Sequence, residues 1–177
     1  MASDPEVMFN PVEVRTQKGR TLDVREYSFE DFGALVEMYK SFQPKRVAQG
    51  LPPPDVPRIE SWLDKLQLKS RSLLVLEEKR IVAHAILCPI SETAVEFTIF
   101  VHQDYRGERL GTVLTRLSVA FAAERGFCDV FLTTELSNVP AVRLYRKVGF
   151  QLISRYGEEC EMKLSLAGAQ EAQPQAA

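Results

Sequence analysis

The feature that most constrains the fold is a change of hydrophobic period near the middle of the chain. From Leu73 to Val101 the sequence consists of the apolar runs "LLVLEE", "IVAHAILCPI" and "TAVEFTIFV". Such runs, separated by short turns, are typical of consecutive antiparallel strands. After Arg106 the apolar residues recur at helical spacing instead, at Leu110, Val113, Leu114, Leu117 and Phe121. The sequence therefore predicts three strands followed by an amphipathic helix that ends near Gly126.

The residues before this run predict a hairpin and two helices. The stretch 12–27 alternates apolar and polar residues on both sides of a Lys-Gly pair, as two strands joined by a tight turn would. A helix is expected after the capping pattern of Ser28 and Asp31, and a second one around Trp62. Between them, residues 43–57 contain five of the ten prolines of the chain, which favours an extended connection.

The residues after the central helix complete one α/β (α+β) domain. Residues 128–134 form a short strand-like run, and Asn138 is expected to cap a helix that ends at Gly149. A closing hairpin follows. We expect the domain to span residues 1–166 and a flexible tail to span residues 167–177, whose small residues bury little surface.

Composition and charge exclude several classes of protein. A chain of 177 residues forms one domain that buries roughly 70% of its unfolded surface. The net charge of -2 argues against a nucleic-acid partner. No run approaches the ~20 apolar residues of a membrane span, and no signal-peptide pattern begins the chain. Three widely spaced cysteines fit neither a zinc site nor a disulfide framework, so we expect buried or half-buried thiols in the cytoplasm.

The stretch "VHQDYRGERLG", residues 101–111, places Arg106 and Arg109 at the expected start of the central helix. Positive charge is unfavourable at a helix N-terminus, and two arginines also repel each other. A bound anion resolves both conflicts, because the first N–H groups of a helix lack partners and the helix dipole favours negative charge. Gly107 and Gly111 allow phosphate oxygens to approach the backbone closely. The alternative is a solvated basic turn before a surface helix.

Two segments resemble the signatures of the GNAT superfamily of N-acetyltransferases. Arg106 to Gly111 is similar to its R/Q-x-x-G-x-G/A motif, except that Arg109 stands where the family usually has glycine. A segment similar to N-x-x-A-x-x-L-Y-x-K-x-G-F falls on Asn138, Ala141, Leu144, Tyr145, Lys147, Gly149 and Phe150. The resemblance covers about residues 90–160. It implies the GNAT fold, a mixed and mostly antiparallel sheet with one parallel pairing, a splayed cleft and helices on both faces.

The resemblance implies acetyl-CoA as cosubstrate and no metal. In this family the pyrophosphate lies at the start of the central helix. The pantetheine arm pairs with the backbone of the preceding strand, which usually bulges and splays from its neighbour, and one N–H of that strand polarises the thioester carbonyl. The implied acetyl-CoA-binding residues are Ile99, Phe100, Val101, Arg106, Gly107, Glu108, Arg109, Leu110, Gly111, Thr112, Asn138 and Ala141.

The resemblance also implies two catalytic residues. Tyr145 is the candidate acid, since a phenol of pKa about 10 can donate a proton to a departing thiolate whose acid has a pKa of about 8.5. Glu96 is the candidate base, because many relatives carry a glutamate at this position of the strand, and bacterial protein lysine acetyltransferases have a similar "AEF" there. The alternatives are a packing role for Tyr145 and a solvent-facing position for Glu96.

Five further residues are weaker candidates. His84 is either an auxiliary base in the cleft or a packed or surface residue. His102 caps the end of its strand or lies near the cofactor, and Cys160 lies beside the acceptor site or in the core. Lys45 and Arg46 belong to the proline-rich connection, which in this superfamily often walls the acceptor pocket. They either recognise an acidic acceptor or lie in a solvated loop.

The expected reaction is transfer of acetyl from acetyl-CoA to a primary amine, by direct attack in a ternary complex, with a protein lysine or peptide amine favoured. A small-molecule amine or amino acid is the alternative acceptor. A non-catalytic acyl-CoA sensor is the alternative of another class, although the presence of Glu96 and Tyr145 argues against it. The sequence leaves open whether the chain forms a homodimer.

Overall fold

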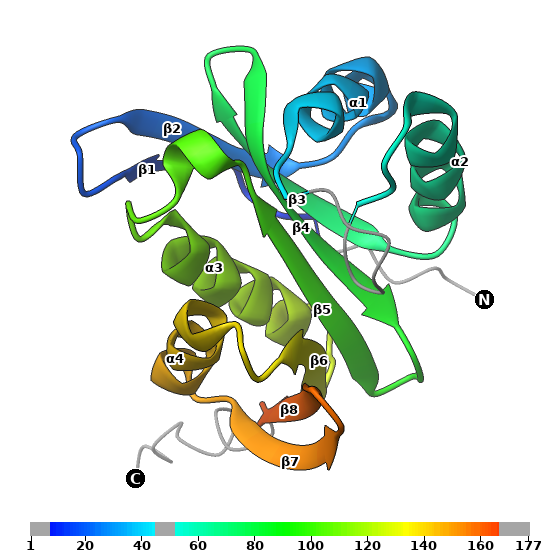
Figure 1. The fold of residues 1–177 in the computed structure, drawn as a ribbon, viewed down its shortest axis with the longest axis vertical. Coiled ribbons are helices and arrows are strands. Elements are labelled where there is room, and N and C mark those ends of the chain that lie inside the picture. Colours follow the sequence, from blue (N-terminus) through cyan, green and yellow to red (C-terminus); the bar gives the residue numbers. More distant parts are fainter. Residues whose placement is uncertain (1–7, 45–51, 167–177) are drawn as a thin grey trace, which may run out of the picture.

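Eight strands form one mixed sheet in the computed structural model, which describes residues 8–44 and 52–166 (Figure 1). Their spatial order is β1-β2-β3-β4-β5-β6-β8-β7. Within the described residues all neighbours are antiparallel except β5 and β6, which confirms the expected mixed sheet. The strands are β1 (Val12–Arg15), β2 (Thr21–Glu26), β3 (Arg71–Glu77), β4 (Arg80–Pro89), β5 (Ala94–Val101), β6 (Asp129–Glu135), β7 (Gln151–Tyr156) and β8 (Glu159–Ser165).

Helices cover both faces of the sheet, as expected. One face carries α1 (Phe32–Ser41) and α2 (Val56–Gln67), and the other carries α3 (Leu110–Glu124) and α4 (Val139–Val148) (Figure 1). Each face has its own hydrophobic core. The core under α1 and α2 includes Tyr39, Leu63 and Phe100, and the core under α3 and α4 includes Phe97, Leu114, Phe121 and Tyr145.

The central strand β4 shows why part of the sequence is apolar without alternation. Residues Ile81 to Leu87 are all buried, because the helices on both faces place both sets of alternating side chains in a core. The edge strand β1 instead alternates half-buried and exposed residues. Its hairpin with β2 confirms the one expected over residues 12–27, and Gly19 in the turn has a φ of +83°.

Local capping sets the start of α1 but not of α4. The Ser28 backbone N–H donates to Asp31 Oδ2 at 2.8 Å, which is the expected capping box, and a 3₁₀ turn at Phe29–Asp31 leads into α1. Asn138 precedes α4, yet its side chain makes no capping hydrogen bond. The expected side-chain cap is therefore wrong, because Asn138 has a ψ of 63° and not the extended backbone that capping requires.

The three cysteines lie in different environments. Cys160 is buried and Cys88 is half-buried, but Cys128 is exposed just before β6, so the expectation of covered thiols is wrong there. None of the described helices is both long and apolar enough to cross a membrane. The cytoplasmic location stays a prediction, as does the C-terminal tail over residues 167–177, which lies outside the described residues.

His84 takes part in a buried hydrogen-bonded chain between α1, β4 and β3. Its Nδ1 lies 2.7 Å from the Tyr39 hydroxyl oxygen, and its Nε2 lies 2.8 Å from Ser72 Oγ. All three residues are buried. Burial lowers the pKa of His84 to about 3, so the ring is neutral at physiological pH, with one nitrogen donating and the other accepting. His84 is a packed core residue.

We predict that the protein loses stability as the pH falls from 7 to 5. His84 has a pKa of about 3 in the folded chain and 6.5 in the unfolded chain, so below pH 6.5 protonation favours the unfolded state. The expected loss at pH 5 is about 2 kcal/mol in urea unfolding. His84→Gln should be less stable at pH 7 but less sensitive to pH. An equally steep pH dependence in that variant would contradict the assignment.

Candidate functional site

β5 and β6 diverge after a short parallel contact. They pair only where Ala94–Glu96 faces Asp129–Phe131, and β6 continues its pairing with β8 alone. From Phe97 to Val101, β5 pairs with β4 on one edge and with no described strand on the other. The backbone groups of that second edge are available to a ligand that pairs as a strand does.

This divergence confirms the expected splay, but its cause differs from the expected bulge. The register between β4 and β5 is constant from Pro89 and Val95 to Ala83 and Val101. The strands separate because β6 follows β8 while β5 follows β4. Ile99, Phe100 and Val101 lie on the unpaired part of β5, where their main-chain groups can serve as the sequence analysis expected.

Side chains along β5 alternate between the two faces of the sheet. Phe97 belongs to the core under α3 and α4, whereas Phe100 packs against Tyr39 and Trp62 under α1 and α2, with ring centroids 5.6 and 5.9 Å apart. Glu96 shares the face of Phe100 and is exposed. The structure thus places Glu96 at the point of divergence, on the side covered by α1 and α2.

Tyr145 reaches β5 from the opposite face. It lies on α4 and is 8% exposed, with its ring 6.4 Å from the ring of Phe97 and 5.8 Å from that of Phe150. Burial raises the pKa of Tyr145 to about 12, because an apolar environment disfavours the phenolate. The phenol therefore stays protonated at neutral pH. Since Phe97 follows Glu96 directly, an acid and a carboxylate flank the same part of β5 from opposite faces.

The start of α3 offers backbone donors to an anion. The N–H of Val113 donates to the carbonyl of Arg109 at 3.2 Å, and the N–H groups of Leu110, Gly111 and Thr112 precede this first helical bond. The first turn contains no acidic residue, and no side chain caps it. An anion bound here gains three donors and the favourable end of the helix dipole.

Arg109 adopts a backbone conformation that glycine reaches without a steric penalty. Its φ is +62°, in the left-handed region, and Gly107 in the same loop has a φ of +74°. An L-residue is destabilised in this conformation because its Cβ crowds the backbone. The Arg109 side chain is exposed beside the free N–H groups.

Gly111 lies at the contact between α3 and α4. A Cβ at this position would lie 3.0 Å from Leu144 Cδ1, so a side chain here would make the Leu144 side chain shift. The sequence predicted that this glycine allows a phosphate to approach the backbone. Gly111 belongs to the first signature and Leu144 to the second, so this contact joins the two signatures.

Arg106 and Glu108 point to neighbouring segments of the chain. The Arg106 guanidinium donates to the carbonyls of Val101, at 2.9 Å, and Gln43, and it stacks over the Phe42 ring at 5.1 Å. It therefore ties the end of α1 to the loop that precedes α3, and its expected phosphate contact stays a prediction. Glu108 is buried next to the hairpin turn between β1 and β2.

The remaining candidates occupy less central positions. Asn138 is exposed, whereas Ala141 packs at the edge of the core under α3 and α4. His102 caps the 3₁₀ turn at Gln103–Tyr105, since its side chain accepts from the Asp104 N–H. Cys160 lies in the core. Lys45 and Arg46 fall outside the described residues. Within the described residues no group of three or more His, Cys, Asp or Glu side chains could hold a metal ion.

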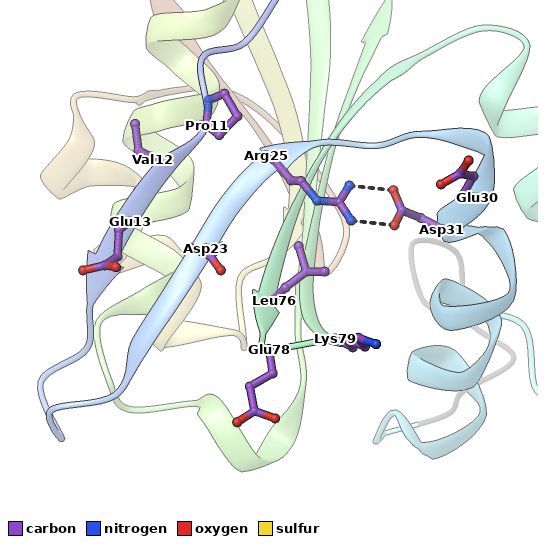
Figure 2. Close-up of a pocket in the computed structure, with 10 residues that line it drawn as sticks. All are labelled: Pro11, Val12, Glu13, Asp23, Arg25, Glu30, Asp31, Leu76, Glu78 and Lys79. Atoms are coloured by element: carbon purple, nitrogen blue, oxygen red, sulfur yellow. Dashed lines mark hydrogen bonds and ion pairs between the residues drawn. The ribbon is translucent and has the colours of Figure 1, made fainter.

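A cavity of about 480 Å³ lies elsewhere, between the N-terminal hairpin and the start of α1 (Figure 2). Arg25 and Asp31 pair at 2.7 Å along its wall (Figure 2). Its lining includes the carboxylates Glu13, Asp23, Glu30, Asp31 and Glu78. An acidic lining does not suit a phosphorylated ligand, and the cavity shares no residue with the β5–β6 divergence. The candidate site therefore comprises the divergence and the start of α3.

Known proteins share this fold and the sequence pattern around the loop before α3. Residues 34–150 match the model of the acetyltransferase (GNAT) family. The chain belongs to this family. The match confirms the resemblance drawn from the two signatures, and it extends from α1 through the end of α4.

Curated relatives match over shorter stretches. Mouse N-acetyltransferase 8 is 40% identical over 55 residues, which are 31% of this chain and 24% of that protein. The mycothiol acetyltransferase of Thermobifida fusca is 38% identical over 64 residues, which are 36% of this chain and 19% of that protein. The chain thus matches about a quarter or less of the length of these two relatives.

Solved structures share the fold over nearly the whole chain. The GNAT domain of S. lividans PAT has a TM-score of 0.76 at 16% identity, covering 88% of this chain and 97% of that domain. The yncA protein of Salmonella typhimurium, solved with its cofactor acetyl-CoA, has a TM-score of 0.66 at 21% identity, covering 88% and 99%. A variant of the spermidine N-acetyltransferase SpeG from Vibrio cholerae has a TM-score of 0.66 at 17% identity, covering 82% and 94%.

We predict that Arg109→Gly stabilises the protein. Glycine adopts a positive φ without a steric penalty, and this gain should exceed the entropic cost of a more flexible unfolded chain. The free energy of unfolding measured in urea should therefore rise by about 0.5–1 kcal/mol. Arg116→Gly is the matched control, because Arg116 is an exposed position inside α3 and should lose about 1 kcal/mol. Equal losses in both variants would contradict the strain at Arg109.

Proposed function

We propose that this protein transfers an acetyl group from acetyl-CoA to a primary amine. The observation that carries the proposal is the divergence of β5 from β6, with the open start of α3, a protonated Tyr145 and the exposed Glu96 arranged around it. The attack would be direct, in a ternary complex, with one proton-transfer group for the leaving thiol and the other for the incoming amine. One face of β5 serves the leaving group and the other serves the incoming amine.

The residues present fit acetyl-CoA. The N–H groups of Leu110, Gly111 and Thr112 would hold the pyrophosphate, with the exposed Arg109 beside them. Main-chain groups of Ile99, Phe100 and Val101 would pair with the amides of the pantetheine arm. Acetyl-CoA supplies the acetyl group as an activated thioester. A β5 N–H directed at the thioester carbonyl would stabilise the negative charge that develops on its oxygen.

Tyr145 is suited to the role of acid. A phenol with a pKa of about 12 remains protonated at every physiological pH, so it always has a proton to donate. The thiolate that leaves is the conjugate base of an acid with a pKa of about 8.5, and a hydrogen bond from the phenol would stabilise the negative charge that develops on its sulfur. The apolar contacts with Phe97 and Phe150 fix the ring in one orientation.

Glu96 is suited to the role of base. Only about 1 in 10³ lysine-like amines is neutral at pH 7, so removal of a proton from the incoming amine accelerates the attack. An exposed carboxylate at the divergence can accept this proton directly or through one water molecule. The exposure of Glu96 fits the solvent-facing alternative as well, so activity measurements must decide between the two.

A protein lysine or peptide amine is the acceptor that we favour. Exposure of Glu96 on the side of α1 and α2 suits an acceptor too large to be enclosed. A small amine is the second candidate, because the shared fold also serves a spermidine acetyltransferase and fold does not select the acceptor. Calorimetric titration with acetyl-CoA, followed by thiol release with pooled amines and with a lysine-rich protein, tests the proposal. Binding without release would favour an acyl-CoA sensor, and no binding would refute both.

We predict that Tyr145→Phe lowers kcat by about 10²-fold while the Kd for acetyl-CoA changes less than about twofold. The substitution removes the proton donor but keeps the ring contacts with Phe97 and Phe150. Stopped assays of thiol release give kcat, and calorimetry gives Kd. A variant that binds less tightly but turns over normally would reverse the assignment.

We predict that Glu96→Gln lowers the rate most at neutral pH and recovers partly at higher pH, where the amine loses its proton unaided. The expected loss at pH 7 is about 10–10²-fold, and it should shrink by pH 9. Glu92→Gln is the control, since Glu92 is an exposed carboxylate in the turn before the same strand. If the pH profiles of all three proteins coincide, Glu96 is not the base.

A further inference from the structure

A buried carboxylate, that of Glu108, lies in the loop from Arg106 to Arg109. We name this segment the cofactor loop after the proposed function. Glu108 is 1% exposed, although it stands between the exposed residues Gly107 and Arg109. Burying a carboxylate costs several kcal/mol unless cations or hydrogen-bond donors surround it. A charge in such a position is retained only when a specific set of neighbours compensates it, and those neighbours here belong to the N-terminal hairpin.

The hairpin turn contacts Glu108 through both side chains and backbone. Lys18 Nζ and Arg20 Nε each lie 3.4 Å from Glu108 Oε1. The Gln17 N–H donates to the Glu108 carbonyl at 3.3 Å. The hydroxyl of Thr16, more than the charges of Arg20 and Lys18, lowers the pKa of the Glu108 carboxyl, so Glu108 is ionised at neutral pH. The five-residue stretch from Thr16 to Arg20 therefore encloses one side of the loop.

Arg20 extends this support to the residue before the loop. Its guanidinium lies 4.6 Å from the centre of the Tyr105 ring, and its Nη1 lies 3.2 Å from Glu77 Oε1. The Tyr105 hydroxyl also donates to Glu77. Tyr105 is 1% exposed and ends the short helix that leads into the loop. Arg20 thus touches groups on both sides of Arg106 and Gly107.

We propose that Glu108 is a positioning residue for acetyl-CoA, and that the turn of the N-terminal hairpin, through Lys18 and Arg20, holds the pyrophosphate-binding loop in its binding conformation. The inference rests on the proposed function. The N–H groups that would bind the pyrophosphate begin two residues after Glu108, so the direction in which they point depends on how the loop is anchored. Donors fixed before the ligand arrives bind it without an ordering cost.

The first test compares Glu108→Gln with the wild type by calorimetry and steady-state kinetics. The Kd and KM for acetyl-CoA should rise about tenfold, whereas kcat at saturating acetyl-CoA should change less than about twofold. If the charge of Glu108 acted on the ligand directly, its removal would instead tighten acetyl-CoA binding, because a negative charge repels the pyrophosphate. Glu13→Gln is the matched control. It removes the same charge from an exposed position on the same hairpin and should bind acetyl-CoA as the wild type does.

A second variant keeps the test valid if Glu108→Gln folds poorly. Arg20 is 37% exposed, so Arg20→Gln is easier to tolerate and should weaken acetyl-CoA binding by a similar factor. The double variant should bind only about as weakly as the worse single variant, because both substitutions break one connection. If the rise in Kd of the double variant equals the product of the rises in the two single variants, the substitutions act independently and the proposal is overturned.

Hydrogen exchange of the cofactor-free protein separates this inference from the proposed function. Amides of residues 106–112 should exchange faster in Glu108→Gln and Arg20→Gln, and at the wild-type rate in Glu13→Gln. Wild-type exchange and wild-type acetyl-CoA affinity in the first two variants would overturn the anchoring role. If the wild-type protein itself fails to bind acetyl-CoA, the proposed function falls, and the exchange rates alone then decide whether the hairpin holds the loop.

Discussion

The short parallel pairing between β5 and β6 is the constraint on which the rest of the site depends. It covers Ala94–Glu96 and Asp129–Phe131 and then ends, because β6 continues along β8 while β5 stays with β4 in constant register. If the pairing ran on to Val101, no backbone edge would be free for a ligand. If it were absent, β1 to β5 and β6 to β8 would form two separate sheets. The short pairing of β5 with β6 thus joins the strands into one sheet and leaves the edge of β5 after Glu96 unpaired.

The alternation of side chains on β5 divides the chemistry between two faces. Phe97 meets Tyr145 in the core under α3 and α4, and Glu96 points to the side of α1 and α2. Here the apolar face raises the pKa of Tyr145 to about 12, while Glu96 remains exposed on the other face. The strand itself keeps the proposed acid and the proposed base apart.

The cofactor loop shows how far a motif predicts the roles of its residues. The resemblance to the family signatures implied one common role, acetyl-CoA binding, for Arg106, Glu108, Arg109 and Gly111. In the structure Arg106 donates to the Val101 carbonyl, Glu108 is enclosed by the hairpin turn, and Gly111 makes room for Leu144. Only Arg109, which is exposed, and the N–H groups after it keep the proposed role in anion binding. Neither Lys18 nor Arg20 could be selected beforehand, because two cations beside a turn glycine are ordinary on any exposed hairpin.

The hydrophobic period and the turn residues by themselves determined the helices and strands of this protein. The spacing of apolar residues along a segment selects a helix or a strand, and this spacing can be read from the sequence. The hairpin, the capping box of Ser28 and Asp31, the three central strands and the helix after Arg106 all follow from such local patterns. The family signatures also marked residues 106–111 as the candidate cofactor-binding segment. Tertiary structure alone decided that β5 and β6 part after Glu96, that His84 is buried and neutral, and that the hairpin supports the loop. These features depend on contacts between residues far apart in the sequence, and local spacing carries no information about which distant partners meet.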